Sequence, residues 1–515
     1  PYTTLFRSNI GAILARRAYL QPNKVGLISG DQRLTFRDLN RRANQTARAL
    51  AASGVKRGDR VAVLLRNCVE YYEFYFGVAK LGAILTGINW RLARPEVRYI
   101  LENSGAKILF YSEEFLESAS GQRDEVPELQ QEIMVGAAPK NTVRTYHDFL
   151  SGFSGDDFEV IGGDDDPLVL MYSSGTTGQP KGALLTHNQL FWCSLTITHT
   201  LDHRQTDINL LPLPMYHVGG ISFVTTYIHI GSTVVLIPVW DTNRALSLIE
   251  REKINHFMAV PAMLNGLLNA PEYDQYDLSS LRWLLASAAP VPADLIKAYH
   301  DRGILVLQSY GLTETAGPAI VTPKEMAIKK IGTAGLPFFH TEVRLAGFKG
   351  ETVGVGEVGE ILIRGPHVIT GYWRNEAASR SAIRDGWFHS GDLATQDEDG
   401  YITIVDRKKD MIISGGENIY PAALERFLYK HPKLSEVAVI GVPDEKWGET
   451  VCAVVVLRKG EALTLDELRA FCDGQIARYK MPRKLIIRKD PLPVNPTGKL
   501  LKGELRRQLF EQRES

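Results

Sequence analysis

The first third of the chain contains two kinds of hydrophobic pattern: segments with apolar residues at helical spacing, and short continuous apolar runs. Segment 34–54 places apolar residues at helical spacing, which predicts an amphipathic helix. The run DRVAVLL at 59–65 is apolar and rich in valine, as buried strands are. Because helical patterns and short apolar runs alternate from about residue 9 to residue 150, we expect a parallel sheet covered by helices.

Further apolar runs occur later in the chain, and each ends at small or polar residues. They are LVLMY (168–172), INLLPLP (208–214), STVVLIP (232–238), WLLAS (283–287) and ILVLQSY (304–310). Open α/β sheets bind their ligands beyond the carboxyl ends of the strands. The ends of these runs are therefore where a ligand site is expected.

The pattern changes near residue 340. The runs GEILIRG (359–365), WFHSGDLA (387–394) and GYITIVDR (400–407) predict the short strands of a small β subdomain. Two strands and two helices after residue 407 predict a smaller α+β domain of about 110 residues.

The predicted fold class is therefore α/β. We expect a large N-terminal domain of helix-covered sheets with the β subdomain (residues 9–405), followed by a smaller, mobile α+β domain (residues 406–515). Residues 1–8 look unrelated to the rest of the chain, and we interpret them as a non-native leader.

Composition adds only broad limits. Of 515 residues, 44% are hydrophobic and 23% charged, and Lys plus Arg equals Asp plus Glu at 59 each. This balance is ordinary for a globular protein and predicts no recruitment of nucleic acid or acidic membrane. The four cysteines lack CxxC spacing, which argues against a disulfide framework or a zinc site. With neither an eighteen-residue apolar run nor a signal-peptide pattern, we expect a cytoplasmic protein without stable membrane insertion.

The stretch YSSGTTGQPKG at 172–182 directly follows an apolar run. Glycines let the backbone approach an anion, while hydroxyls and a lysine amine supply donors and charge. Pro180 before Lys181, and Gly182 after it, exclude a Walker A loop. The stretch predicts a loop that binds the phosphates of ATP; a surface loop of small residues is the alternative.

Six motifs, in this order, resemble the adenylate-forming superfamily of acyl-CoA synthetases, peptide-synthetase adenylation domains and luciferases. They are YSSGTTGQPKG (172–182), PLPMYH (212–217), SYGLTET (309–315), SGD (390–392), DRKKDMIISGGENIYP (406–421) and PTGK (496–499). Within the superfamily, DEKWGE (444–449) and RYKMP (478–482) look most like feruloyl- or 4-coumarate-CoA and fatty-acyl-CoA ligases. The resemblance implies an AMP-forming acid–thiol ligase. A carboxylate attacks the α-phosphate of ATP, pyrophosphate leaves, and coenzyme A attacks the acyl-adenylate.

The resemblance also implies roles for residues around ATP and Mg²⁺. Glu314 would coordinate Mg²⁺, Thr313 would contact the α-phosphate, and Lys499 would stabilise the carboxylate and α-phosphate during adenylation. Asp392 would accept hydrogen bonds from the ribose, with Arg407 as a second contact. The β- and γ-phosphates would be held by Ser173, Ser174, Gly175, Thr176, Thr177, Gly178 and Lys181. The adenine would be bordered by Ser287, Ala288, Ala289, Gln308, Ser309, Tyr310 and Gly311.

For the smaller domain, the resemblance implies a hinge at Asp406. Gly415 and Gly416 would leave room for the pantetheine arm of coenzyme A. Trp447 would contact coenzyme A; a half-buried packing tryptophan is the alternative.

The acyl pocket is expected around His217, which would gate the pocket or contact phosphate and is not assigned as a general base. Small, apolar and aromatic residues would line it, namely Trp192, His217, Gly219, Gly220, Ser222, Ala286 and Gly317. Since no aspartate or basic residue stands out among them, amino acids and dicarboxylates are disfavoured.

A hydrophobic monocarboxylate remains as the substrate. We favour a hydroxycinnamic acid such as ferulate or 4-coumarate, because small residues suit a flat ring and Ser222 or Tyr172 would bond a phenol. A medium- or long-chain fatty acid is the alternative. A luciferase, or an inactive nucleotide-binding regulator, fits the sequence less well, since Lys499, Glu314 and Asp392 are all present.

Overall fold

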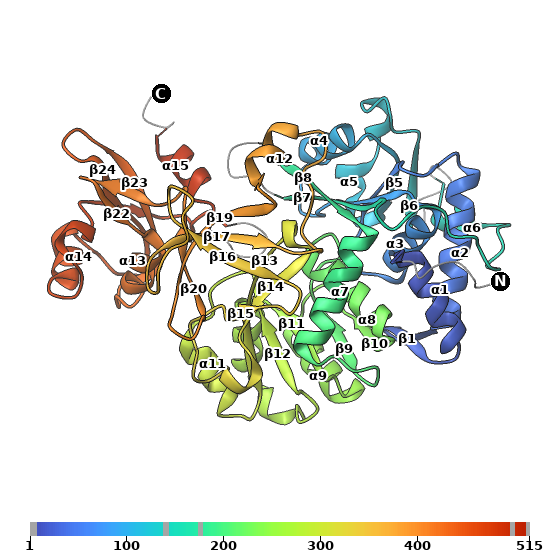
Figure 1. Ribbon diagram of the computed structural model, residues 1–515, viewed down its shortest axis with the longest axis horizontal. Helices are drawn as coiled ribbons and strands as arrows, with labels where there is room; N and C mark the ends of the chain where they lie inside the picture. The colour runs from blue at the N-terminus through green and yellow to red at the C-terminus, as the bar shows by residue number, and fades with distance from the viewer. Residues whose placement is uncertain (1–7, 137–143, 174–178, 495–499, 511–515) are drawn as a thin grey trace. The chain divides into compact units, whose positions relative to one another are not determined.

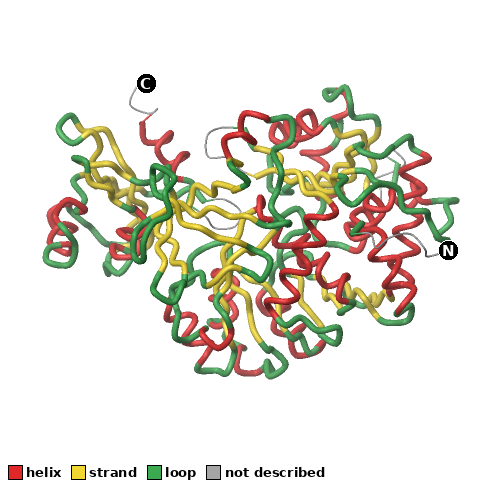
Figure 2. The backbone as a smooth tube through the Cα atoms, in the orientation of Figure 1, coloured by secondary structure: helices red, strands yellow, loops and turns green. Residues whose placement is uncertain are grey.

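The computed structural model describes residues 8–136, 144–173, 179–494 and 500–510 (Figure 1). It divides into two compact units, which we describe separately. The larger unit is Pro1–Glu342 with Ile363–Phe388, and the smaller is Val343–Leu362 with His389–Ser515. Helices and strands are mixed throughout both (Figure 2), which confirms the predicted α/β class. The boundary expected at residue 406 stays a prediction.

The first sheet of the larger unit has six strands in the order β6-β5-β3-β4-β7-β8. Strands β3 to β7 are parallel, as the alternating pattern predicted, and β8 runs antiparallel beside β7. The strands are β3 (Arg60–Leu64), β4 (Ile84–Gly87), β5 (Ala106–Ser112), β6 (Gln131–Val135), β7 (Pro167–Ser173) and β8 (Lys181–Thr186). The helices before β7 are α1 (Ile10–Leu20), α2 (Phe36–Ala52), α3 (Val69–Leu81), α4 (Arg94–Ser104), α5 (Leu116–Ala119) and α6 (Tyr146–Leu150).

Local chemistry sets where these helices begin and end. The Thr35 hydroxyl accepts the Asp38 N–H at 3.2 Å, and the Asp38 carboxylate accepts the Thr35 N–H at 2.9 Å, so a capping box starts α2. Helix α4 ends at Gly105, whose φ of 65° places it in the left-handed region that glycine adopts without a Cβ clash.

The second sheet has nine strands in the order β15-β14-β13-β12-β11-β9-β10-β1-β2. Its central strands are parallel, and β2, β14 and β15 at the two edges are antiparallel. The strands are β1 (Val25–Ser29), β2 (Gln32–Thr35), β9 (Ile208–Leu211), β10 (Thr233–Leu236), β11 (His256–Ala259), β12 (Trp283–Ala286), β13 (Leu305–Leu312), β14 (Gly317–Val321) and β15 (Leu336–Pro337). The four apolar runs predicted between 208 and 310 form β9, β10, β12 and β13.

Successive side chains of this sheet point into two different cores. Val234 and Leu236 belong to the core that includes α1, α3, α7 (His187–Leu201) and α8 (Val218–Ile230). Val235 between them belongs to the core under α9 (Thr242–Glu252), α10 (Pro261–Leu268) and α11 (Ala293–His300). The first core also contains residues of the six-stranded sheet, such as Val61 and Val169. The helices of the first core therefore share a hydrophobic interior with both sheets.

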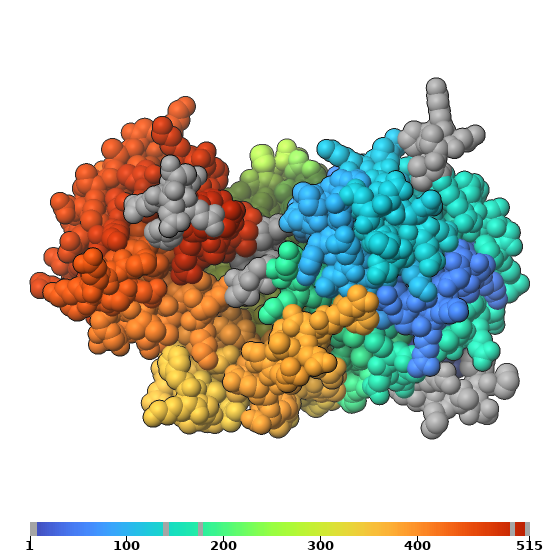
Figure 3. Space-filling model, turned by 90° about the horizontal axis from the view of Figure 1, so that it is seen from above, coloured from blue at the N-terminus to red at the C-terminus, as the bar shows by residue number. Residues whose placement is uncertain are grey.

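The segment 363–388 returns to the larger unit late in the sequence. It carries α12 (Glu376–Ala382) and β18 (Ile383–Arg384). Trp373 donates its backbone N–H to the Gly182 carbonyl at 2.8 Å and its indole N–H to the Asn103 carbonyl at 3.0 Å. These bonds hold the segment, orange in Figure 3, next to the blue and green parts of the same unit.

The smaller unit contains two sheets. Strands β16 (Glu342–Ala346), β17 (Gly359–Arg364), β19 (Trp387–Gln396) and β20 (Ile402–Arg407) contribute to the first, and β19 and β20 are antiparallel. The second has the order β22-β21-β24-β23, with β25 beside β24. Its elements are β21 (Ile412–Ser414), β22 (Glu417–Ile419), α13 (Pro421–Leu428), β23 (Leu434–Asp444), β24 (Gly448–Leu457), α14 (Leu465–Cys472), β25 (Lys484–Arg488) and α15 (Lys502–Phe510). Over the residues described, no helix is both long and apolar enough to cross a bilayer.

Candidate active site

The predicted phosphate loop joins two antiparallel strands. Strand β7 ends at Ser173 and β8 begins at Lys181, and these two residues are partners in the strand register. The structure therefore brings the first hydroxyl and the lysine of the motif opposite each other. The other predicted loop residues, Ser174, Gly175, Thr176, Thr177 and Gly178, lie outside the described residues, as does Lys499.

Glu314, the predicted metal ligand, lies in a short 3₁₀ turn, Thr313–Thr315, that follows β13. Its side chain is buried, and its Oε1 accepts a hydrogen bond of 2.8 Å from the Tyr372 hydroxyl. Its backbone carbonyl accepts the Ile369 N–H at 2.9 Å. A buried carboxylate with oxygen ligands to spare fits a hard cation such as Mg²⁺.

Tyr372 also connects Glu314 with the phosphate loop. The Lys181 ammonium lies 5.6 Å from the centroid of the Tyr372 ring, within the range of a cation–π contact. Sequence reasoning missed Tyr372, because nothing in its local pattern indicates that the late segment 363–388 returns to the site.

The two segments expected to border adenine lie side by side. Ala286 at the end of β12 is the register partner of Gln308 in β13, and the Ser309 hydroxyl donates to the Ala286 carbonyl at 3.3 Å. Ser287 and Gln308 are buried, whereas Ala288, with a φ of 73°, is exposed on the turn that continues to Ala289. Tyr310, Gly311 and Thr313 come next in the chain and are partly buried.

Among the described residues of the predicted site, two buried nitrogens have no hydrogen-bond partner within the described chain. They are Nε2 of Gln308, whose Oε1 accepts the Gly332 N–H at 3.2 Å, and Nε2 of His217. Such atoms are uncommon in folded proteins and are satisfied by a ligand or by water. Both are available to a polar ligand, although similar buried atoms occur away from the site, such as Nε1 of Trp283.

His217 immediately precedes α8, after the strand-end segment PLPMY. Burial, and then the charge of nearby Arg91, lowers the pKa of His217 to about 4. Arg91 donates to the hydroxyl of the adjoining Tyr216 at 3.0 Å. At neutral pH His217 is therefore an uncharged hydrogen-bonding group, not a cation that attracts phosphate.

The residues that suggested a phenol contact are already engaged. The Ser222 hydroxyl is buried and donates to the Ala316 carbonyl, to which the Cys193 thiol also donates at 3.0 Å. The Tyr172 hydroxyl donates to Oδ1 of Asn103 at 2.7 Å. Both hydroxyl protons are therefore already used, so a phenol contact, which stays a prediction, would need the phenol to donate to Ser222 or Tyr172.

Chain packing also accounts for several of the predicted small residues. A Cβ on Gly220 would lie 2.2 Å from the Pro214 carbonyl oxygen, and one on Gly219 would lie 2.9 Å from Leu213. A Cβ on Gly311 would lie 2.2 Å from the carbonyl oxygen of Gly317, which itself has a φ of 138°. Backbone packing requires Gly220 and Gly311, and the positive φ favours glycine at 317, so these glycines are not evidence for a flat substrate ring; at Gly219 a Cβ would meet only the flexible end of Leu213.

The other predicted pocket residues differ in their surroundings. Ala286 is fully buried in the core under α9 to α11, which explains its small size. Trp192 is partly buried in α7, and its ring meets that of His340 edge to face with centroids 5.2 Å apart.

In the smaller unit, the predicted ribose ligands form an ion pair. Asp392 on β19 is buried, and its Oδ1 lies 3.0 Å from Nε of Arg407 on β20. The predicted hinge residue, Asp406, accepts the Arg407 N–H at 2.7 Å and the Ala422 N–H at 2.6 Å. Since Ala422 lies in the first turn of α13, Asp406 fixes the start of that helix to the end of β20.

The predicted coenzyme A contacts adjoin one another in the same unit. Gly415 donates its N–H to the Trp447 carbonyl at 2.9 Å, and a Cβ on Gly415 would lie 2.6 Å from the Trp447 ring. Gly415 and Gly416 both have positive φ, at 60° and 84°. The Arg483 guanidinium lies 4.6 Å from the centroid of the Trp447 ring. A packing role for Trp447 is thus present, and a coenzyme A contact stays a prediction.

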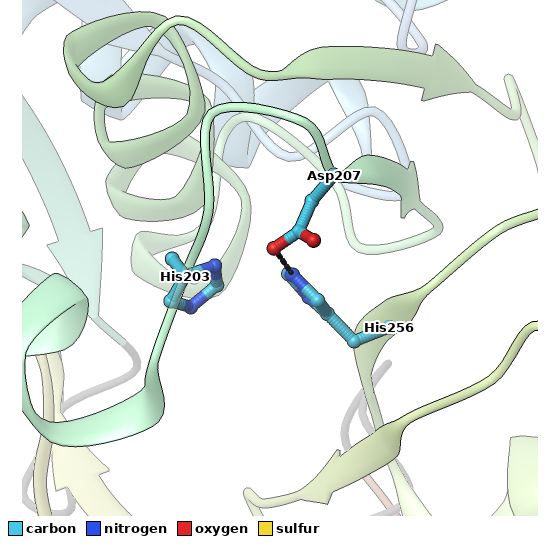
Figure 4. Close-up of side chains that lie close together, drawn as sticks. All are labelled: His203, Asp207 and His256. Carbon is cyan, nitrogen blue, oxygen red and sulfur yellow. Dashed lines mark hydrogen bonds and ion pairs between the residues drawn. The ribbon is translucent and has the colours of Figure 1, made fainter.

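A separate cluster of His203, Asp207 and His256 lies at the amino ends of β9 and β11, the opposite end of the sheet from the predicted site (Figure 4). Their ligand atoms lie within 4.8 Å of one another. However, Oδ2 of Asp207 already accepts from Nε2 of His256 at 3.1 Å and from Nη2 of Arg282 at 2.6 Å. Because a guanidinium already supplies positive charge there, we interpret the cluster as structural.

Comparison with known proteins assigns the chain to a family. Residues 14–373 match the family model for AMP-binding enzymes. Residues 423–499 match the family model for the C-terminal domain of AMP-binding enzymes. The chain belongs to the AMP-binding enzyme family. The predicted resemblance to the adenylate-forming acyl-CoA synthetases is confirmed, and so is the enzyme class, an AMP-forming acyl-CoA ligase.

Relatives of this enzyme differ in the acid they are named for. It is 41% identical to a feruloyl-CoA synthase of Amycolatopsis sp. over 499 residues, covering 97% of this chain and 98% of that protein. It is 40% identical to the long-chain-fatty-acid–CoA ligase FadD13 of Mycobacterium tuberculosis over 508 residues, with coverage of 97% and 98%. The solved structure of o-succinylbenzoate coenzyme A synthetase from Bacillus subtilis, in complex with ATP and magnesium ion, matches with a TM-score of 0.85 and 32% identity over 96% of this chain and 99% of that one.

Proposed function

We propose that this ligase joins a hydroxycinnamic acid such as ferulate to coenzyme A, consuming ATP with Mg²⁺. The similarity to a feruloyl-CoA synthase, 41% identical along nearly the whole chain, is the observation that carries the choice of acid. The choice of acid does not rest on a phenol hydrogen bond, since the Ser222 and Tyr172 hydroxyls already donate to protein acceptors.

A medium- or long-chain fatty acid is the second candidate. A fatty-acid–CoA ligase is almost equally similar, at 40% identity, and neither a flat-ring cavity nor a free phenol partner distinguishes the aryl acid. The test is AMP release that depends on both ATP and coenzyme A, measured with ferulate, with cinnamate and with a series of alkyl acids. We expect the highest kcat/KM for ferulate; a higher value for any alkyl acid would reverse the choice.

In this proposal, different site residues act in different steps of the reaction. Glu314 would hold Mg²⁺, which would supply positive charge beside the phosphates, while Ser173, Lys181 and the rest of the loop would hold the pyrophosphate. Asp392 and Arg407 bind the ribose. Lys499, in the proposed lid of residues 406–515 with its hinge at Asp406, stabilises charge only while the adenylate forms.

Replacing Lys499 by alanine separates the two steps. We expect pyrophosphate release to fall about 100-fold or more, as happens when a donor to transition-state charge is removed. Thioester formation from preformed acyl-adenylate should continue at the normal rate. Equal loss in both half-reactions would show that the lysine has been assigned the wrong role.

A further inference from the structure

Tyr372 occupies a fixed position between two groups of the proposed ATP site. It pairs with Ala183 of β8 in an isolated antiparallel bridge, and its N–H donates to the Ser379 hydroxyl of α12 at 2.8 Å. The neighbouring Trp373 bonds to the Gly182 carbonyl at 2.8 Å. The backbone around the tyrosine is therefore attached both to the strand that begins at Lys181 and to α12.

The hydroxyl of Tyr372 points to the carboxylate of Glu314. It donates to Oε1 at 2.8 Å, and Glu314 is only 9% exposed. A hydrogen bond to a charged carboxylate is stronger than a neutral one and fixes the plane of that carboxylate. Oε2 is then left in one orientation for a cation.

The ring of Tyr372 faces the other side of the site. Lys181 lies 5.6 Å from its centroid, so the ring limits where the ammonium is held. One side chain thus contacts both the carboxylate expected to bind Mg²⁺ and the lysine expected to bind phosphate.

We propose that Tyr372 is a positioning residue for Mg·ATP: its hydroxyl orients the Glu314 carboxylate toward the metal, while its ring sets the place of Lys181. This inference rests on the proposed function, in which Glu314 is the Mg²⁺ ligand. Groups that orient a metal ligand through hydrogen bonds change metal affinity by about 10- to 100-fold when removed.

The chain offers a matched control for the hydroxyl. Tyr146 donates to Oε2 of Glu73, also at 2.8 Å and also buried, in the core beside α2 and α3. Tyr372→Phe and Tyr146→Phe therefore remove the same group from the same kind of partner, one at the site and one in the core. Tyr372→Leu removes the ring as well.

The test measures the Kd of a non-hydrolysable ATP analogue by calorimetry, with saturating Mg²⁺ and with EDTA, together with Tm. For Tyr372→Phe we expect the Kd with Mg²⁺ to rise about tenfold and the Kd in EDTA to stay unchanged. Tyr372→Leu should weaken both, because Lys181 loses its contact. Tyr146→Phe should lower Tm and leave both Kd values unchanged.

Two outcomes would overturn the proposal. In the first, Tyr372→Phe behaves like Tyr146→Phe: its Tm falls and the Mg²⁺ dependence of its Kd stays normal. In the second, the Tyr372→Phe protein does not fold, because the hydroxyl is then structural. The Glu314→Gln variant distinguishes a wrong role for Tyr372 from a wrong proposed function. If Glu314→Gln abolishes the Mg²⁺ dependence and Tyr372→Phe does not change it, only the role of Tyr372 is wrong. If Glu314→Gln has no effect either, the metal ligand itself is misassigned.

Discussion

Acid should destabilise the larger unit, because burial holds at least six of its histidines uncharged: His203, whose pKa lies well below its usual value, and five others. Burial lowers the pKa of each of these five to about 4; they are His187, His217, His229, His256 and His367. In an unfolded chain a histidine has a pKa of about 6.5. The unfolded state thus binds more protons than the folded state between these values. Stability is complete above about pH 6.5 and is lost as the pH falls toward about 4.

The size of the effect can be worked out from these two pKa values. Between about pH 7.0 and about pH 5.5, each such histidine lowers the free energy of unfolding by about 1.2 kcal/mol. Five of them lower it by about 6 kcal/mol, a large part of the roughly 5–15 kcal/mol that stabilises a typical domain. Most carboxyl groups contribute little over this range because they titrate at lower pH; buried Glu73, whose pKa is raised by burial, acts in the opposite direction.

The assay is urea unfolding at a series of pH values, with the slope of the free energy against pH giving the number of protons taken up. Replacing the partly buried His229 by asparagine should reduce that slope, whereas replacing the exposed His147 should not. A free energy of unfolding that changes by less than about 1 kcal/mol from pH 7.0 to pH 5.5 would refute the reasoning.

Three further substitutions test separate parts of the structure. Trp283 is 1% exposed and stacks on His256, so Trp283→Ala should cost about 3–5 kcal/mol of stability, measured as a lower urea midpoint. Since the Ser222 hydroxyl is engaged with the Ala316 carbonyl, Ser222→Ala should lower Tm yet leave the ratio of kcat/KM for ferulate to that for cinnamate unchanged. Arg407→Gln breaks the ion pair with Asp392 and should raise the KM for ATP about tenfold in a pyrophosphate-release assay; Tm should also fall, because the buried Asp392 carboxylate loses its cation.

The strands are the part of the fold that the sequence predicts well. A short apolar run that ends in small or polar residues is typical of a buried strand. Buried strands do form in all three such runs, at 59–65, 232–238 and 283–287. The helix expected over 34–54 begins at Phe36, because Leu34 and Thr35 belong to β2. The capping box of Thr35 and Asp38 is visible in the sequence as T-x-x-D and indicates that start.

Of the candidate site, the sequence predicts only the residues that belong to recognisable motifs. The sequence identifies hydroxyls and glycines, but it does not show which distant carbonyl or carboxylate each one meets. Ser222 finds its partner 94 residues away, and Tyr372 meets Glu314 across 58 residues. For this reason the sequence alone suggests Ser222 as a substrate contact and does not indicate Tyr372.

The return of segment 363–388 has a consequence for how the protein is made. Synthesis proceeds from the N-terminus, and domains fold as their residues emerge from the ribosome. The larger unit lacks its final segment until residue 388 has been added, after residues 343–362 of the other unit. Glu314 is thus translated well before its partner Tyr372. We expect a nascent chain arrested at residue 362 to hold both sheets with an incomplete site, available to chaperones until the last segment arrives.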